Sequence, residues 1–435
     1  MKILIKNGLV IDTINNVEEV KSILIDHGRI IKIDKDINEE AEMVIDAKDK
    51  LVFPGFIDMH VHFRDPGYEY KETIETGLKA AVAGGFTAVC TMPNTKPIAD
   101  NSFIVEYIKR QAKDTALAKV YPIGSISKGL QGAELSEMGE MISSGAIAFS
   151  DDGVPVSNTL LLRRALEYLK KFNGLIITHN EDLALRNNGA MNEGYSATVL
   201  GLPGIHRAVE ESAIARDIEI AKNFGRIHIA HVSCKGSVEL IRFAKQRGID
   251  VTAETAPHYF ALTDADITSY DTNFKMNPPL RTEEDRLAII EGLKAGTIDC
   301  IATDHAPHGI DDKNVEFDHA AFGIVGLETS VGLVFEKLVK ENKFTNLEIA
   351  KLMSINPAKI IGKEKDFVLK ENSEANITII DPNIKKKIDS SKFFSKGKNS
   401  PFVGREVNAE AYATIVMGKV KYYDGQIILK EQNSK

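Results

Sequence analysis

The run GFIDMHVHFRDPG at residues 55–67 carries two histidines, His60 and His62, at the end of an apolar stretch. Side chains two residues apart on a β-strand point to the same face. The two imidazoles would therefore point the same way from the end of a buried strand, an arrangement that suits binding of one metal ion. An ordinary half-buried strand can also carry two histidines, so the surrounding sequence decides between these interpretations.

Apolar strands and amphipathic helices alternate through the middle of the chain. After the first candidate strand, Ile74, Leu78 and Val82 fall on one helical face, and Gly84 with Gly85 ends that helix. The candidate strands occupy residues 56–62, 87–92, 120–124, 146–150, 175–179, 227–232, 250–254 and 300–304. This repeat predicts an α/β fold of the (β/α)8 TIM-barrel type, in which the chemistry lies at the C-terminal ends of the strands.

The two ends of the chain show a different pattern of short strands and tight turns. Asn7-Gly8 and His27-Gly28 follow apolar runs near the N-terminus, and Asp424-Gly425 does so near the C-terminus. Because chain ends often lie close together, they are predicted to form one small β-sandwich domain. The expected boundaries are 1–53 and 366–435 for this composite domain and 54–365 for the barrel.

The composition is that of an ordinary globular protein, with 435 residues, 43% hydrophobic and 27% charged. A net charge of -8 argues against a general nucleic-acid-binding protein. Cys90, Cys234 and Cys300 lie far apart, which favours reduced thiols in a cytoplasmic protein. No apolar run is long enough to span a bilayer and the first residues do not resemble a signal peptide, so no membrane association is expected.

Histidines and carboxylates collect where the predicted strands end. They are His60, His62, Asp151, Asp152, His179, His231 and Asp304. Because the C-terminal ends of barrel strands meet at one rim, these side chains should lie close together, and imidazole with carboxylate is a typical zinc ligand set. Strand alternation allows only one of Asp151 and Asp152 to face inward and does not say which.

The other histidines are predicted to serve elsewhere. His228 has the opposite strand parity from His231, so it should face the helices. His258 and His305 border the predicted site, where a supporting or structural role is expected. His27, His206 and His319 are predicted to lie on the surface.

Five motifs in order along the chain resemble bacterial dihydroorotases of the class I type, which are cyclic amidohydrolases of the amidohydrolase superfamily. They are GFIDMHVHFR at 55–64, TMPNT at 91–95, FSDDG at 149–153, ATDHAPH at 302–308 and FGIVGLE at 322–328. The resemblance covers essentially the whole chain. It implies zinc-dependent, reversible hydrolysis of (S)-dihydroorotate to N-carbamoyl-L-aspartate in de novo pyrimidine (UMP) biosynthesis.

The resemblance also implies roles for individual residues. It assigns one zinc to His60, His62 and Asp304, and a second to His179 and His231. Many relatives bridge the two metals with a carboxylated lysine from strand four, but this chain has no lysine there, and the class I pattern implies Asp152 as the ligand. One or two zinc ions are therefore expected, with two preferred. Residues expected to contact the substrate are His62, Phe63, Arg64, Asn94, Asn277, His308, Phe322 and Gly323.

These implied roles fit the chemistry of the side chains. Zinc lowers the pKa of bound water to roughly 7, which makes a nucleophile available at neutral pH. Asp304 is expected to take the proton from the attacking water and to pass it to the leaving nitrogen. Arg64 can grip the substrate carboxylate, although a surface ion pair with Asp65 would also explain this arginine. The acidic segment 309–318 is a candidate lid over the substrate.

Two other functions fit part of this pattern. A hydantoinase or allantoinase would share the fold but typically carries the bridging lysine. A non-catalytic dihydroorotase-like partner of aspartate transcarbamoylase would have lost metal ligands, whereas this chain keeps the expected positions. A small-molecule substrate is expected, with no nucleic-acid partner, while a homodimer and an association with aspartate transcarbamoylase are both left open.

Overall fold

The computed structural model describes residues 2–429. Its central feature is a barrel of eight parallel strands that pair in chain order. They are β6 (Phe56–Val61), β7 (Phe86–Thr91), β8 (Lys119–Gly124), β9 (Ala148–Phe149), β10 (Leu175–Thr178), β13 (Arg226–Ile229), β14 (Val251–Thr255) and β15 (Cys300–Ile301). A bridge between Val61 and His305 joins the two ends of this sheet and closes the barrel. All eight strands predicted from the sequence are therefore present.

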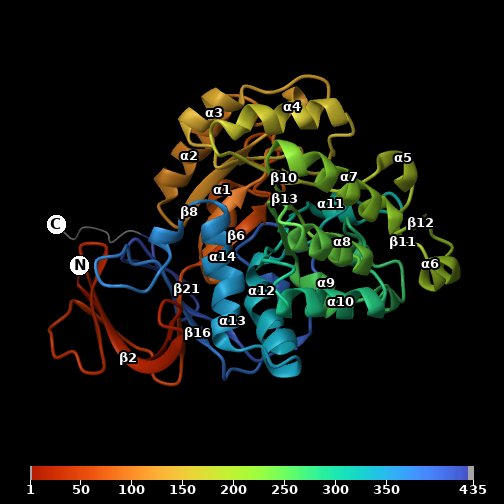
Figure 1. Cartoon of the computed structure of the whole chain (residues 1–435). Helices are drawn as coiled ribbons and strands as arrows, with labels where there is room; N and C mark the ends of the chain where they lie inside the picture. The colour runs from red at the N-terminus through yellow and green to blue at the C-terminus, as the bar shows by residue number, and fades with distance from the viewer. Residues whose placement is uncertain (1, 430–435) are drawn as a thin grey trace.

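Helices surround the barrel on its outer side (Figure 1). In α1, Thr73 caps the N-terminus and Gly84 the C-terminus, as the glycine pair predicted, and Ile74, Leu78 and Val82 are buried. The longer helices are α1 (Ile74–Ala83), α2 (Ser102–Thr115), α3 (Met138–Ser144), α4 (Thr159–Lys170), α7 (Ala208–Phe224), α8 (Lys235–Gln246), α10 (Glu283–Lys294) and α12 (Leu327–Val334). The shorter ones are α5 (Leu183–Arg186), α6 (Tyr195–Leu200), α9 (Pro257–Ala261), α11 (Ile310–Lys313), α13 (Asn346–Ala350) and α14 (Asn356–Ile360).

Both ends of the chain contribute to a second sheet, seen in Figure 1 where red N-terminal strands lie beside blue C-terminal ones. Its order is β21-β20-β19-β16-β5-β1-β2-β3, with β4 paired to β1. The strands are β1 (Ile3–Asp12), β2 (Val17–Asp26), β3 (Arg29–Asp34), β4 (Met43–Asp46), β5 (Leu51–Pro54), β16 (Ile377–Asp381), β19 (Glu410–Val416), β20 (Lys419–Tyr423) and β21 (Gln426–Ile427). The two ends meet where β5 pairs antiparallel with β16.

This terminal unit differs in detail from the predicted β-sandwich. Its strands are hydrogen-bonded into one continuous sheet, and residues from both chain ends, among them Ile23 and Ile415, share one apolar cluster. The segment between β16 and β19 leaves that sheet, and its β17 (Lys386–Lys387) pairs separately with β18 (Glu406–Val407). The domain boundaries near residues 53 and 366 stay a prediction.

The predicted hairpin turn at Asn7-Gly8 is wrong. The strand β1 continues through both residues, and the ladder with β2 shifts its register between Ile5 and Gly8, so the pair forms a bulge. A Cβ at Gly8 would lie 2.4 Å from Cγ2 of Val52, so close packing against β5 requires glycine there. The turns at His27-Gly28 and Asp424-Gly425 are confirmed, because each joins two paired antiparallel strands.

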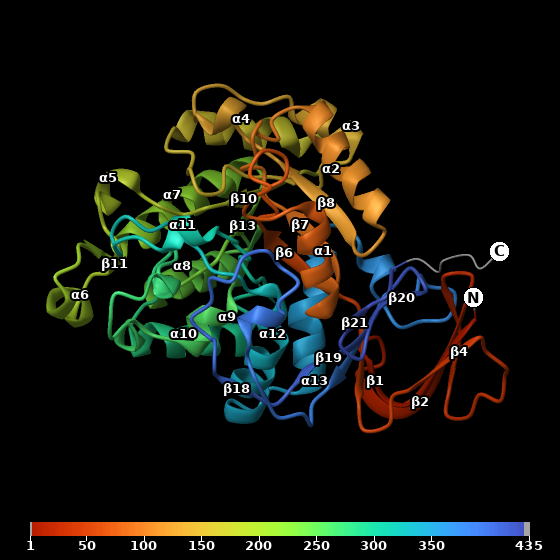
Figure 2. The same ribbon diagram turned by 180° about the vertical axis from the view of Figure 1, so that it is seen from behind.

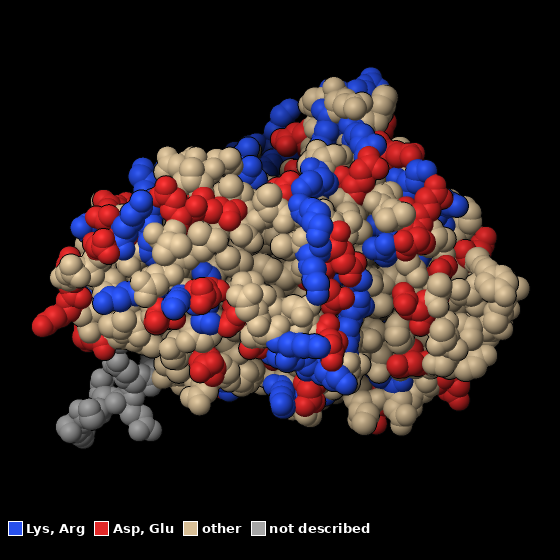
Figure 3. Space-filling view, turned by 90° about the horizontal axis from the view of Figure 1, so that it is seen from below, with Lys and Arg blue, Asp and Glu red and all other residues tan. Residues whose placement is uncertain are grey.

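Surface and thiol features agree with the composition. The three cysteines are all buried and free. On the face seen in Figure 3, acidic and basic side chains are interspersed. Among residues 2–429, no helix combines the length and the apolar character that crossing a bilayer requires.

Candidate active site

The two histidines of the first barrel strand present the same nitrogen to the barrel mouth. Nδ1 of His60 lies 2.8 Å from Oε1 of Glu254, and Nδ1 of His62 lies 2.8 Å from Oδ1 of Asn94. Because those oxygens accept hydrogen bonds, each Nδ1 carries the proton and each Nε2 is free to bind a metal. Both Nε2 atoms face Oδ1 of Asp304, at 3.5 Å from His60 and 3.2 Å from His62. The predicted first ligand set therefore converges.

The second predicted pair lies opposite, at the ends of β10 and β13. Nδ1 of His179 is 2.7 Å from Nε2 of His231. Nε2 of His179 is 3.3 Å from Oε2 of Glu181, so this histidine keeps its Nδ1 free to bind a metal, unlike His60 and His62.

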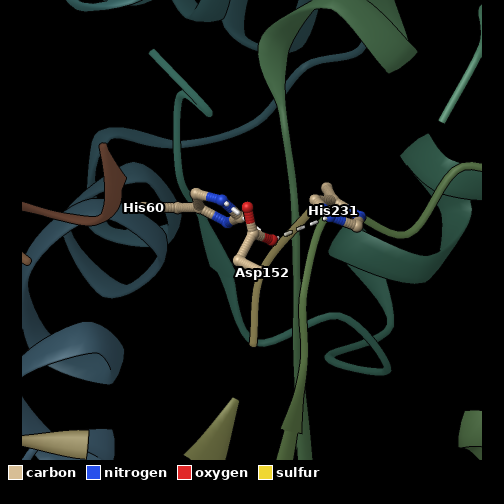
Figure 4. Close-up of side chains that lie close together, drawn as sticks. All are labelled: His60, Asp152 and His231. Carbon is tan, nitrogen blue, oxygen red and sulfur yellow. Dashed lines mark ion pairs between the residues drawn. The ribbon is translucent and has the colours of Figure 1, made fainter. Parts of the chain in front are cut away.

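Asp152 lies between the two histidine pairs, and Figure 4 shows it between His60 and His231. Its Oδ1 is 3.4 Å from Nε2 of His60, 3.4 Å from Nδ1 of His179 and 3.6 Å from Nε2 of His231. Its Oδ2 is 3.4 Å from Nε2 of His62. One carboxylate thus faces all four imidazoles.

The neighbouring Asp151 points away from this cluster. Its Oδ1 accepts hydrogen bonds from the backbone N–H groups of Ile126, at 2.7 Å, and Ser127, at 3.1 Å, and its Oδ2 accepts one from the Ser127 hydroxyl. Burial raises the pKa of Asp151 to about 6, and these hydrogen bonds oppose that rise. Asp151 therefore holds the loop after β8, and the structure resolves which of the two aspartates faces inward.

The donor set fits a metal ion. Nε2 of His60 and Oδ1 of Asp152 are buried yet have no hydrogen-bond partner, an arrangement that is costly unless a cation binds there. Ligand atoms of His60, His62 and Asp304 lie within 4.8 Å of one another, as do those of His60, Asp152 and His231. Although burial raises the pKa of Asp152, His60, His179 and His231 hold it well below its usual range. The carboxylate is therefore ionised, as a metal ligand must be.

The two adjacent aspartates allow a direct test of this assignment. In protein loaded with zinc, replacing Asp152 by Asn should reduce the metal bound per chain by about half or more, because it removes a charged carboxylate that faces both histidine pairs. Replacing Asp151 by Asn should leave the zinc content unchanged, because its carboxylate faces backbone donors. Metal analysis after dialysis measures both, and equal zinc content in the two variants would contradict the bridging role.

The prediction that His228 faces the helices is wrong. Its Nε2 is 3.1 Å from Oε2 of Glu254, the carboxylate whose other oxygen meets His60. The parity argument failed because β13 ends at Ile229, so His231 lies beyond the strand and has a positive φ of 36°. Alternation of side chains does not extend past the last strand residue.

The remaining histidines lie as expected. Nε2 of His305 is 3.4 Å from Oε2 of Glu72, and its Nδ1 is 3.2 Å from the N–H of Gly326, so it supports the chain after Asp304. His258 is buried, which lowers its pKa to about 4. The exposed histidines are His27, His206 and His319.

Arg64 and Lys71 form a positively charged side of the mouth, with His308 between them. Nε of Arg64 donates to the carbonyl of Pro307 at 3.3 Å, and an Arg64 terminal nitrogen lies 3.5 Å from Nε2 of His308. Nζ of Lys71 lies 3.3 Å from Nδ1 of the same imidazole. Burial and these neighbouring cations lower the pKa of His308 to about 2, so the imidazole is neutral. Two cationic side chains beside a neutral histidine suit a carboxylate ligand.

The alternative that Arg64 pairs with Asp65 is wrong. Asp65 accepts hydrogen bonds from the N–H of Ile74 at 3.1 Å and the hydroxyl of Tyr107 at 3.0 Å. Arg64 itself has a positive φ of 62°, so the chain turns directly after the histidine pair and sends the two side chains in different directions.

Other predicted substrate contacts also lie at this mouth. Nδ2 of Asn277 donates to Oε1 of Glu181 at 3.0 Å, and Nε2 of His308 is 2.8 Å from the carbonyl of Phe322. Gly323 has a φ of 125°, which favours glycine. The ring of Phe63 is buried against Gly77, so a substrate contact by Phe63 would involve its backbone.

The candidate lid is held at several points. Nζ of Lys275 donates to the carbonyl of Asp318 at 2.9 Å, and Asp312 pairs with Lys71 at 3.2 Å. Within the segment 309–318, Nζ of Lys313 donates to the carbonyls of Thr272 at 3.0 Å, Lys275 at 3.1 Å and Ala321 at 2.7 Å. Burial, with Lys275 nearby, lowers the pKa of Lys313 to about 7. A closing motion of this segment stays a prediction.

Three supporting residues were not singled out from the sequence. Glu254 joins His60 to His228, and it ends the seventh predicted strand, so the rule that chemistry collects at strand ends could have found it. Glu181 links His179 to Asn277 and follows that histidine by two residues. Asn399 contacts the backbone near His308 from the C-terminal part of the chain, and no sequence signal marked it.

The barrel and its ligand cluster define a cyclic amide hydrolase, and solved structures of such enzymes are similar throughout. An L-hydantoinase (dihydropyrimidinase) from Arthrobacter aurescens superposes with a TM-score of 0.89 at 27% identity, covering 98% of this chain and 97% of its own. A dihydropyrimidinase from Brevibacillus agri gives 0.84 at 21% identity, covering 99% and 96%, and shows the shared fold.

Relatives with higher sequence identity define the family more narrowly. A dihydroorotase from Pelotomaculum thermopropionicum is 51% identical over 98% of this chain and 99% of its own, and one from Geobacter metallireducens is 52% identical over 97% and 100%. A family model described as Dihydro-orotase-like matches residues 49–237. The chain belongs to the dihydroorotase family.

Proposed function

We propose that this chain catalyses the reversible hydrolysis of (S)-dihydroorotate to N-carbamoyl-L-aspartate, a step of de novo pyrimidine synthesis. The observation that carries the proposal is the convergence of four imidazoles and two carboxylates next to Arg64. Such a site can hold a metal that would act on a ring amide, and its arginine can bind an exocyclic carboxylate. Dihydroorotate has both groups, and relatives of about half identity carry the dihydroorotase name.

We infer that the metal is zinc and that two ions bind. The proposed ligands are His60, His62, Asp152, His179, His231 and Asp304. Imidazole and carboxylate ligands suit zinc, and Asp152 faces both histidine pairs, which supports two ions sharing one carboxylate. When bound, zinc polarises a carbonyl and makes water a stronger acid.

Asp304 is proposed to move the proton. Burial raises its pKa, but His60 and His62 reverse this and hold the pKa well below its usual range, so the carboxylate is ionised and can accept a proton. Its Oδ1 lies 3.5 Å from Nε2 of His60 and 3.2 Å from Nε2 of His62, so it would be close to a water held by a metal at these histidines. The same group can then protonate the leaving ring nitrogen.

Residues around the barrel mouth are proposed to recognise the substrate. Arg64 would bind the substrate carboxylate, and Asn94, Asn277, His308 and the backbone of Phe322 and Gly323 would hold the ring. His62 and the backbone of Phe63 complete the proposed contacts. Because Arg64 is already held through the carbonyl of Pro307, it is oriented before the substrate arrives.

Replacing Arg64 by Ala should raise KM for dihydroorotate by about 10- to 100-fold, because a charge-assisted hydrogen bond contributes about 1.5–3 kcal/mol. A smaller effect on kcat is expected, since the carboxylate does not react. Steady-state kinetics measure both constants. Arg163→Ala is a suitable control, because that arginine pairs with Glu167 on the exposed face of α4. An unchanged KM in the Arg64 variant would remove its proposed role.

A comparison of substrates tests the proposed function itself. The purified chain should hydrolyse dihydroorotate with a far higher kcat/KM than hydantoin or allantoin, and should form dihydroorotate from N-carbamoyl-L-aspartate. A preference for hydantoin or allantoin would favour the hydantoinase alternative. No turnover by the zinc-loaded protein would favour a non-catalytic partner, although the convergence of all six proposed ligands supports catalysis.

We also propose a cytoplasmic location, supported by three reduced, buried thiols. A homodimer and an association with aspartate transcarbamoylase remain proposals from the family resemblance. Light scattering of the chain alone and mixed with a transcarbamoylase measures both.

A further inference from the structure

A segment near the C-terminus leaves the terminal sheet and returns to the barrel mouth. Residues 393–400, here called the C-terminal clasp, belong to the dark-blue stretch between β17 and β18 that crosses the barrel beside α12 in Figure 2. The N–H of Val325, in the loop after the last barrel strand, donates to the carbonyl of Asn399 at 2.9 Å. Sequence placed the clasp within 366–435, in the terminal domain, yet its contacts are with the barrel.

Two barrel carboxylates hold the clasp in place. Glu328 of α12 accepts hydrogen bonds from the N–H groups of Phe394, at 2.8 Å, and Ser395, at 3.1 Å. Glu72, which is fully buried, accepts from the N–H of Lys396 at 3.1 Å and from the Ser395 hydroxyl. A buried carboxylate without donors is costly, so these contacts fix the clasp against the barrel.

The Asn399 side chain uses this fixed position to join two loops of the mouth. Its Oδ1 accepts a hydrogen bond from the N–H of His308 at 3.1 Å, and its Nδ2 donates to the carbonyls of Ala306 and Gly323, both at 3.0 Å. The side chain is buried, with 4% of the residue exposed. Both amide hydrogens and the amide oxygen are thus engaged. They add to the backbone hydrogen bond from the N–H of Ala306 to the carbonyl of Ile324, at 2.8 Å, in holding the two stretches together.

We propose that the clasp is part of the substrate site and that Asn399 is a positioning residue for substrate binding. The inference rests on the proposed function, in which His308, Phe322 and Gly323 contact the substrate. His308, Phe322 and Gly323 are here called the substrate wall. The Asn399 side chain lies behind this wall and hydrogen-bonds to backbone atoms in this part of the chain, so it acts on the substrate through the wall residues. An error of about 1 Å in such a wall can cost up to 100-fold in efficiency. No metal ligand bonds to Asn399, so metal binding should not depend on it.

Replacing Asn399 by Ala tests the proposal. The expected result is a rise in KM of about tenfold with kcat within about threefold, because the wall contacts the substrate equally before and during reaction. The zinc content should stay at the wild-type level. Loss of stability alone would not change KM, so the split between KM and kcat separates positioning from a purely structural role.

Asn376 offers a matched control in the terminal sheet. It is also buried, and its side chain makes three hydrogen bonds: Nδ2 to the carbonyl of Asp366 and to Oε1 of Glu374, both at 2.8 Å, and Oδ1 from the N–H of Met417 at 2.9 Å. Asn376→Ala should lower the unfolding temperature about as much as Asn399→Ala while keeping the wild-type KM.

Asn399→Asp retains the shape of the side chain, so it provides a second test if the alanine variant does not fold. It keeps an acceptor for His308 but turns an oxygen towards two carbonyls, so a similar or larger rise in KM is expected. An unchanged KM in the folded Asn399 variants, or an equal rise in Asn376→Ala, would overturn the inference. A wild-type enzyme that fails to act on dihydroorotate would instead overturn the proposed function.

Discussion

Replacing Asp304 by Asn is expected to reduce kcat by about 10²- to 10⁴-fold, the usual contribution of a proton-transferring group. Asparagine keeps the size of the side chain but cannot take a proton from water or return one to the ring nitrogen. The lost charge also weakens the first ligand set, because Oδ1 of Asp304 faces His60 and His62. Steady-state kinetics together with zinc analysis would separate these two effects.

Asp299→Asn is a matched control that flanks the same barrel strand as Asp304. Asp299 precedes β15 at the opposite end of the barrel, where its carboxylate accepts from the N–H of Ala253 and pairs with Lys245. Contacts at that end serve stability, so kcat should stay at the wild-type level. An Asp304→Asn enzyme with normal kcat and full zinc content would exclude the proton-transfer role.

Removal of the metal is expected to abolish turnover in both directions, and added zinc should restore it. The buried atoms Nε2 of His60 and Oδ1 of Asp152 then lose the cation that compensates their burial. The unfolding temperature should fall as well, because a ligand present at 100 times its Kd contributes about 2.7 kcal/mol to the free energy of unfolding. The checks are metal analysis, an assay with N-carbamoyl-L-aspartate and a thermal melt.

Magnesium provides the control for metal identity. Mg²⁺ prefers oxygen ligands and an octahedral shell, whereas four of the six proposed ligands are imidazoles, so it should restore little activity. Full activity in protein shown to be free of metal would refute the mechanism. Recovery with magnesium as good as with zinc would refute the choice of metal.

The barrel was predictable because its signal is local and repeated. Each strand is an apolar run, and each is followed by a helix. Eight such units typically form a closed parallel barrel. The convergence of the proposed ligands was predictable for the same reason, since the ends of successive strands meet at one rim. The prediction that His60, His62 and His179 lie together at this rim is confirmed, because all three face Asp152.

The wrong predictions concerned where strands end and turn, not which strands exist. The parity assignment of His228 failed because β13 stops at Ile229, and a positive φ at His231 redirects the next side chains. The turn assigned to Asn7-Gly8 failed because a bulge and a turn use the same residue types. Such decisions depend on what packs against the backbone, which local pattern does not contain.

Local sequence patterns were enough to predict the barrel, the terminal strands and the imidazoles and carboxylates that lie at the strand ends. Strand alternation left open which of Asp151 and Asp152 faces the histidines; the family resemblance implied Asp152, and the folded chain places it there. That Glu254 orients His60 and that Asn399 reaches the mouth from the far end of the chain came from the fold alone. The difference lies in how far apart along the chain the interacting residues are. Periodicity and turn chemistry act between near neighbours, whereas hydrogen-bond partners of buried polar groups are chosen by chain segments that meet only after folding.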